Sequence, residues 1–251
     1  EWLEHHWDSQ RANWILHPVL GMQGASKSQI QQAVTHAVGW LKSHATETDA
    51  DFLISRLLER DDLNPEERDL VVESAGRWLE AYAMERHGDF LISRLLERDD
   101  LNPEERNLVV GFGGRWLDAH ATEAAASFIL AKTLTRLDLT DEQARLAIGQ
   151  AMSWLELHGH EKAAGYVLQH LLKREDIPAY EVRRAATFAN EWLSQNKEAK
   201  GASYVLSVLL ARPDLTDEQA DQAVTSTISW LCIHGLVDTA DRVLRPLLLR
   251  A

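Results

Sequence analysis

Cysteine is nearly absent from this sequence of 251 residues: Cys232 is the only one, so an internal disulfide is excluded. A chain of this kind fits a reducing compartment, and we expect a cytoplasmic protein. Long apolar runs are missing too, since none approaches the ~20 residues that a membrane-spanning helix needs, and the start does not resemble a signal peptide. We therefore expect no membrane partner.

Basic residues are in the minority. The chain has 26 Lys and Arg against 39 Asp and Glu, which gives a formal net charge of −13. A negative field repels a phosphate backbone, and no compact Lys/Arg cluster interrupts it along the sequence. The composition therefore predicts no nucleic-acid partner.

Catalytic constellations are also lacking. No Ser/His/Asp or Cys/His arrangement has a supporting context, and no glycine-rich stretch carries the Lys-Ser/Thr of a phosphate loop. The densest group is His158–Glu161, "HGHE", for which a chance metal site is the alternative to a helix-end role. We expect no enzyme, no cofactor and no metal.

What the sequence does have is a repeat. The eighteen letters "DFLISRLLERDDLNPEER" occupy 51–68 and return at 89–106, and a Trp-Leu pair recurs every 38 residues along the whole chain. Such a period is typical of a solenoid, in which neighbouring units share one continuous core. The tryptophans are Trp2, Trp40, Trp78, Trp116, Trp154, Trp192 and Trp230.

The repeat predicts two helices per unit. A Ser, Asn or Thr stands 24 residues after most tryptophans with Glu or Gln three residues later, the pattern of a capping box, and a helix of roughly 17 residues follows it. A second helix is expected from 7 to 20 residues after each Trp, as at 47–60. It ends at an Arg that we expect to pair with an Asp two residues later.

These patterns predict an all-α fold, a right-handed α-solenoid of about thirteen antiparallel helices in a single repeat domain over 1–251. Because the chain opens on Glu1 and not on Met, we expect a fragment of a longer protein. The expected units are 2–39, 40–77, 78–115, 116–153, 154–191, 192–229 and the partial unit 230–251.

The Trp column is predicted to be core, because it shares a helical face with Leu and with small residues such as Ala75 and Ala151. Histidines four residues after the Trp, such as His44 and His158, are expected to cap helix ends or to bond between helices, since one repeat of separation is too far for shared metal coordination.

A second aromatic column lies twelve residues after each Trp, away from the apolar stripe of its helix. Two interpretations stay open: the rings wedge between successive helices, or they line a groove for a peptide, with nearby residues tuning the choice. The candidate partner-binding face consists of Trp14, Phe52, Phe90, Phe128, Tyr166 and Tyr204 with Arg56, Arg94, Lys132 and His170.

The array of helical hairpins resembles the tetratricopeptide-like superfamily, although its unit is longer than the usual one and starts Trp-Leu-x-x-His. The block Ala-x-aromatic-Val-Leu-x-x-Leu-Leu-x-Arg-x-Asp-Leu/Ile, at 164–177 and 202–215, is similar to degenerate repeats in the sensor regions of bacterial STAND-type signalling NTPases. That resemblance implies ligand or partner sensing within a larger switch protein.

From these features we predict a non-catalytic scaffold that binds a protein or peptide and that serves as the sensing region of a signalling protein. The alternative is a structural module that associates end to end, because the final segment "VLRPLLLRA" is apolar.

Overall fold

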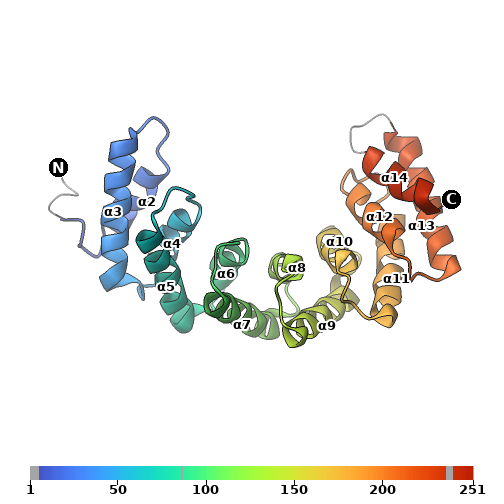
Figure 1. The fold of residues 1–251 in the computed structure, drawn as a ribbon, viewed down its shortest axis with the longest axis horizontal. Coiled ribbons are helices and arrows are strands. Elements are labelled where there is room, and N and C mark those ends of the chain that lie inside the picture. The colour runs from blue at the N-terminus through green and yellow to red at the C-terminus, as the bar shows by residue number, and fades with distance from the viewer. Residues whose placement is uncertain (1–5, 86, 236–239, 251) are drawn as a thin grey trace. The chain divides into compact units, whose positions relative to one another are not determined.

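The computed structural model describes residues 6–85, 87–235 and 240–250, and in these ranges the protein is entirely helical, with short and long helices alternating along the chain (Figure 1). The short helices are α2 (Asn13–Leu20), α4 (Ala50–Leu58), α6 (Gly88–Leu96), α8 (Ala126–Thr135), α10 (Ala164–Lys173), α12 (Ala202–Ala211) and α14 (Ala240–Arg250). The long helices are α3 (Lys27–His44), α5 (Pro65–Tyr82), α7 (Pro103–His120), α9 (Asp141–His158), α11 (Ala179–Gln195) and α13 (Asp217–His234).

The chain divides into two compact units, the first over Glu1–Ala119 and the second over His120–Ala251. In the first unit α2, α4 and α6 pack in succession, and α3 packs on α5. In the second unit α8, α10, α12 and α14 pack in succession, and α11 lies against both α9 and α13. Each unit is thus a layer of short helices on a layer of long ones, and the prediction of an α-solenoid of about thirteen helices is confirmed.

The long helices begin where the capping boxes predict. At Thr216 the side chain accepts the N–H of Gln219 at 3.2 Å, while the Gln219 side chain accepts the N–H of Thr216 at 3.3 Å. The same reciprocal pair starts α3, α5, α7 and α9, at Ser26, Asn64, Asn102 and Thr140. Only α11 starts without one, at Pro178, which has no side chain that can accept a hydrogen bond.

The short helices are shorter than predicted. In the second repeat the helix spans Ala50–Leu58, whereas the sequence suggested 47–60. Two turns occupy the missing residues: the Glu47 N–H bonds the His44 carbonyl at 3.0 Å, and the Ala50 N–H bonds the Glu47 carbonyl at 3.1 Å. No glycine or proline marks this stretch, so the pattern gave no signal of where the helix begins.

The tryptophan column is core, as predicted. Trp2 lies outside the described residues, and the other six tryptophans of the column are at most 4% exposed. The indole N–H groups of five of them also tie one repeat to the one before it, across 31 residues of sequence. The bonds join Trp40 to the carbonyl of Ser9 (2.8 Å), Trp78 to Glu47 (3.0 Å), Trp154 to Glu123 (3.0 Å), Trp192 to Glu161 (2.8 Å) and Trp230 to Ala199 (3.1 Å).

The predicted Arg–Asp pairs form after every short helix from α4 to α12. Arg174 contacts Asp176 through Nε at 2.8 Å, and its Nη1 donates to the carbonyls of Leu134 and Arg136 in the preceding repeat, at 3.0 and 2.7 Å. The guanidinium therefore binds carbonyls that the end of α8 leaves without helical partners. The other pairs are Arg60–Asp62, Arg98–Asp100, Arg136–Asp138 and Arg212–Asp214.

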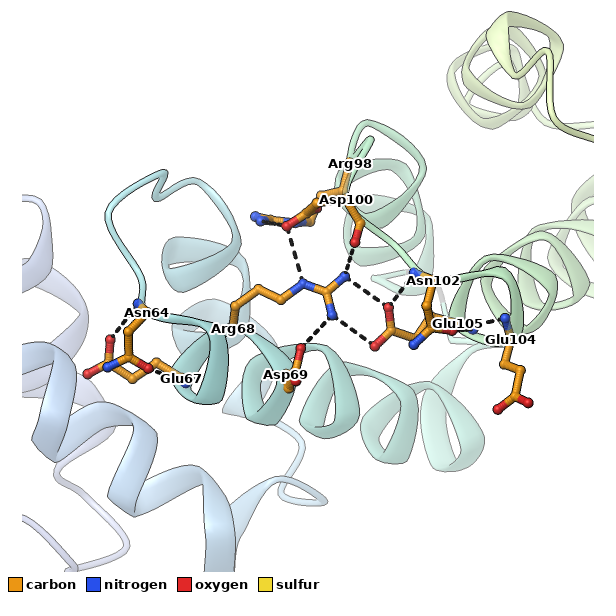
Figure 2. A network of polar contacts seen from close by, with 9 residues as sticks. All are labelled: Asn64, Glu67, Arg68, Asp69, Arg98, Asp100, Asn102, Glu104 and Glu105. Atoms are coloured by element: carbon orange, nitrogen blue, oxygen red, sulfur yellow. Dashed lines mark hydrogen bonds and ion pairs between the residues drawn. The ribbon is translucent and has the colours of Figure 1, made fainter.

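One further arginine joins two repeats in the first unit. Arg68 on α5 reaches the capping-box carboxylate of Glu105 at the start of α7, with contacts of 3.0 and 2.9 Å, and also contacts Asp69 and Asp100 (Figure 2). Burial alone would lower the pKa of Arg68, but its hydrogen bonds to Glu105, Asp69 and Asp100 raise it. The Glu105 carboxylate thus caps its own helix and binds the neighbouring repeat at once.

Among the described residues, no helix combines the length and the apolar composition that crossing a membrane requires.

Candidate functional site

The second aromatic column lies on the surface of the short helices. Its six rings keep between 41% and 67% of their surface exposed, so none of them is wedged between helices. The short helices pack instead through the opposite stripe, such as Ala50, Leu53 and Leu57 on α4, which are all fully buried. Exposed aromatic rings repeated at one position per unit form a regular surface feature, which we call the aromatic column: Trp14, Phe52 and Phe90 in the first unit, and Phe128, Tyr166 and Tyr204 in the second.

In the first unit, charged side chains accompany the rings. Arg56 donates to Glu59 at 2.9 Å, and Arg94 of the next repeat donates to the same carboxylate at 2.8 Å. The Arg94 guanidinium also lies 5.2 Å from the centroid of the Phe90 ring, within the range of a cation–π contact. The arginines therefore sit beside the rings, with their charge largely balanced by glutamate.

In the second unit the balance of acidic and basic side chains beside the rings differs. The helices α8, α10 and α12 contain no Asp or Glu, and their charged or titratable side chains are Lys132, His170 and Lys173. Burial, and then the positive charges of Lys173 and Lys132, lower the pKa of His170. At the far end Arg242 of α14 lies 3.9 Å over the Tyr204 ring. The short helices themselves therefore carry no acid, although Glu175 and Asp176 follow closely after α10 and line one hollow together with His170 and Lys173.

Two hollows open between rings of the first unit. The smaller, of 240 Å³, is lined by Asn13, Trp14, His17 and Phe52, so it lies between consecutive rings of the column. His17 meets Phe52 edge-on, with 6.3 Å between ring centroids, and burial followed by the charge of Arg56 lowers the His17 pKa. A neutral imidazole and two rings form a slot that suits a flat ligand.

The larger hollow, of 370 Å³, includes both Phe52 and Phe90 in its lining. At its wall lies the carboxyl of Asp51, whose pKa is raised by burial, although a backbone hydrogen bond with Phe52 and the nearby His87 partly offset this effect. Sequence reasoning did not single out Asp51. No signal could have identified it, because Asp89 stands in the same eighteen-residue passage and is only half-buried.

The histidine column is structural. His44 stacks on Trp40 with 4.7 Å between centroids, its Nδ1 lies 2.7 Å from the Glu47 carboxylate, and its Nε2 lies 3.1 Å from the Asp8 carbonyl. His158 repeats this arrangement with Trp154, Glu161 and the Thr122 carbonyl. Both imidazoles are thus used in bonds between helices. In the part of the chain that the structure describes, no group of three His, Cys, Asp or Glu side chains could hold a metal ion.

Comparisons with known proteins identify the architecture. No family model matches the chain, and no curated protein matches its sequence. Among solved structures, the Puf3 RNA-binding domain bound to the Cox17 RNA 3′ UTR recognition sequence site A is similar, with a TM-score of 0.50 and 11% identity over 98% of this chain and 73% of that one. The fold is an α-solenoid. At this identity the likeness establishes the fold alone.

Two other solved structures are less similar. The Puf4 RNA-binding domain bound to the HO endonuclease RNA 3′ UTR recognition sequence has a TM-score of 0.47 and 14% identity, covering 97% of this chain and 77% of that one. The RNA-binding domain of yeast Puf5p bound to AAT2 RNA has a TM-score of 0.47 and 12% identity, covering 96% of this chain. The match spans 66% of the Puf5p chain, just under two thirds of its length.

This finding corrects several predictions. The prediction of a protein- or peptide-binding scaffold that takes no nucleic acid is wrong by this comparison, because the Puf3 domain, the solved array of similar fold, is bound to RNA. The same comparison contradicts the sensing role, the alternative of a self-assembling module, and the link to STAND-type NTPases. The physical error lay in the charge argument: net charge sums over the whole chain, whereas binding responds to the field on one face, and α8, α10 and α12 carry no acid.

Proposed function

We propose that this chain is a non-catalytic repeat domain that binds single-stranded RNA along the exposed face of its short helices. One observation carries the proposal: the aromatic column presents one exposed ring per repeat on both units. Aromatic side chains stack on unpaired bases, and base–aromatic stacking is worth about 1–3 kcal/mol per base. The RNA bound by the Puf3 domain of similar fold is consistent with this proposal.

Electrostatics favour the second unit as the part that holds the phosphate backbone. Exposed charges separated by more than a Debye length of about 8 Å are largely screened at physiological salt, so distant acid weakens the attraction only modestly, whereas Glu175 and Asp176 beside Lys173 offset part of it. Lys132, Lys173 and Arg242 lie on α8, α10 and α14, close in sequence or space to rings of the column. In the first unit, where Glu59 balances Arg56 and Arg94, stacking supplies more of the affinity.

The remaining predictions fit the same proposal. We propose that the repeats over 1–251 act as a single domain in the cytoplasm, and that the aromatic column with Arg56, Arg94, Lys132 and His170 is its binding face.

The test is an RNA titration by fluorescence anisotropy with labelled single-stranded homopolymers, and with duplex RNA as competitor. The decisive variant replaces Phe128, Tyr166 and Tyr204 together by Ala, which should weaken binding by at least about a hundredfold if each ring stacks on one base. Because these rings are exposed, the thermal midpoint should barely change.

A matched control comes from the long helices of the same unit. Leu146, Leu157 and Ile228 are 53%, 55% and 52% exposed, comparable with the rings, and their replacement by Ala should leave the affinity unchanged. Equal losses in the two triple variants, or no binding of any single-stranded RNA at low salt, would refute the proposal.

A further inference from the structure

The hollow between Phe52 and Phe90 differs from an ordinary surface groove. Its volume of 370 Å³ is at the small end of the range for ligand pockets, large enough for one heterocyclic base. Both rings keep more than half of their surface exposed, so either can stack on a flat ligand that enters between them. The rest of the lining is polar and comes from α2, α4, α6 and the turn before α6: His17, Asp51, Ser55, Arg56, Glu59, His87 and Asp89.

Three polar atoms on the α4 wall of this hollow are buried and have no hydrogen-bond partner among the described residues. They are Oδ1 of Asp51, Oγ of Ser55 and Nε of Arg56. Asp51 is 9% exposed and Ser55 is 4% exposed, so water reaches neither side chain freely. Burying a polar atom without a partner is unfavourable, and native proteins leave few of them. A ligand that supplied the missing partners would recover this free energy.

The repeated passage shows that packing creates this arrangement. Asp89 and Ser93 occupy the same places in an identical stretch of sequence, yet both are only half-buried. Asp51 and Ser55 face the hollow that α6 and His87 complete, and this neighbour accounts for their burial. The buried acceptors are therefore specific to one repeat, while the second copy of the passage contributes Asp89 and Phe90 to the facing wall.

The donor and acceptor pattern defines the ligand. Asp51 Oδ1 can only accept while the carboxyl is ionised, Arg56 Nε can only donate, and the Ser55 hydroxyl can do either. A complementary flat edge carries N–H donors beside an acceptor. The Watson–Crick edge of guanine has this order, with the N1–H and the N2 amine next to O6. An organic cation fits less well, because Arg56 contributes a fixed positive charge to the same wall.

We infer that this hollow is a guanine pocket, in which Asp51 and Ser55 accept the base N–H groups, Arg56 donates to O6, and Phe52 or Phe90 stacks on the ring. The inference rests on the proposed RNA-binding function for its source of guanine, a base in an RNA strand. A free guanine nucleoside presents the same edge and is the other source.

The experiment compares U-rich RNAs that carry one guanine, one inosine or one adenine at the same place. Inosine keeps N1–H and O6 but lacks the N2 amine, so it reports the second donor alone. We expect the wild-type chain to prefer the guanine RNA over the adenine RNA by about tenfold or more, with inosine between them. Asp51→Asn and Ser55→Ala should each reduce this preference several-fold, while the affinity for the RNA without guanine changes less than about twofold.

Asp61→Asn is the matched control, because it makes the same chemical change at an exposed carboxylate in the loop after α4, outside the lining of the hollow, and should keep the guanine preference. Thermal melting by circular dichroism checks that all variants fold. Absence of a guanine preference in the wild-type chain, or equal effects of Asp51→Asn and Asp61→Asn, overturns the inference while leaving the RNA-binding proposal intact.

Failure of the RNA-binding proposal gives a different result from failure of the guanine pocket. If no RNA binds, the proposed function fails, and titration of guanosine alone decides the pocket. Guanosine binding that Asp51→Asn weakens and Asp61→Asn does not would support the pocket with a free nucleoside as its ligand. No guanosine binding in that case overturns the inference as well.

Discussion

The indole N–H of Trp78 donates to the backbone carbonyl of Glu47 at 3.0 Å, and so joins the end of one long helix to the turn that precedes the short helix before it. The Trp78 ring is 2% exposed, so the packed side chains around it shield this hydrogen bond from water. The same contact recurs one repeat at a time in both units. Each tryptophan thus both fills the core and fixes the position of the preceding turn.

Removing only the indole N–H donor tests whether the tryptophan fixes the position of the preceding turn. Trp154→Phe keeps an aromatic ring but leaves the Glu123 carbonyl without its 3.0 Å partner, so we expect a loss of about 1–3 kcal/mol in the free energy of unfolding. Trp154→Ala also removes the ring and should lose about 3–5 kcal/mol. Urea denaturation measures both, with Phe128→Ala as the exposed-ring control that should change stability by less than about 0.5 kcal/mol. A Phe variant as stable as the wild type would show that the bond contributes nothing.

Arg174 is expected to matter more than an ordinary surface arginine. Its side chain is 4% exposed and binds two carbonyls of the preceding repeat as well as Asp176. Arg174→Met leaves these acceptors without their donor, so we expect a loss of about 2–4 kcal/mol in thermal or urea unfolding. Arg145→Met on exposed α9 surface is the control and should be nearly neutral. Similar losses of stability in the two variants would contradict the role of Arg174 in joining the two repeats.

Asp100 gives a prediction with a defined pH window. The hydrogen bond from Arg98, above all, and the nearby Arg68 lower the pKa of this carboxyl to about 2. The folded pKa lies below the unfolded value of about 3.9, so the stabilisation is complete above about pH 4 and is lost as the pH falls through about 2.

The matching experiment follows urea midpoints of the wild type and Asp100→Asn from neutral to acid pH. Because the carboxylate is about half exposed, we expect a difference of only about 1 kcal/mol near neutrality, and this difference should shrink between about pH 4 and pH 2. The adjacent Asp99→Asn, in the same exposed loop, should show no such difference. A difference in stability between the wild type and Asp100→Asn that stays constant with pH would exclude the ion pairs as its cause.

The salt dependence of RNA binding tests the electrostatic half of the proposed function. Each phosphate contact on a single strand contributes about −0.7 to the slope of log K against log salt. We expect Lys173→Met to make the slope shallower by about 0.7, and Lys197→Met, in the turn before α12, to leave it unchanged. The slopes come from anisotropy titrations between about 50 and 200 mM salt. An identical slope for the wild type and both variants would show that Lys173 does not contact a phosphate.

Much of the fold could be predicted because its signals are local and periodic. The capping box at Thr216, the buried Trp154 and the Arg174–Asp176 pair all follow from residue type and spacing. The carbonyls that Trp154 and Arg174 bind could not be predicted, since any residue has a carbonyl and only packing decides which one lies within reach.

The candidate site was harder to predict. The repeat pattern predicts the position of Phe90 on its helix. It could not decide whether the ring packs between helices or stays exposed, because the burial of the ring depends on how closely successive short helices approach. Asp51 and Asp89 show the limit most directly, because the seventeen residues that follow each of them are identical and yet their burial differs. The partner prediction failed for a related reason, since a total charge does not say which helices carry it.

The indole-to-carbonyl bond that spans 31 residues also bears on how such a chain can evolve. Inserting or deleting a whole 38-residue unit leaves every remaining tryptophan with a carbonyl at the right distance along the chain, whereas an insertion of half a unit would misplace all contacts at the junction. Recombination between identical stretches such as 51–68 and 89–106 changes length by one whole unit. The array can therefore gain or lose whole repeats in single genetic events without any new core having to arise.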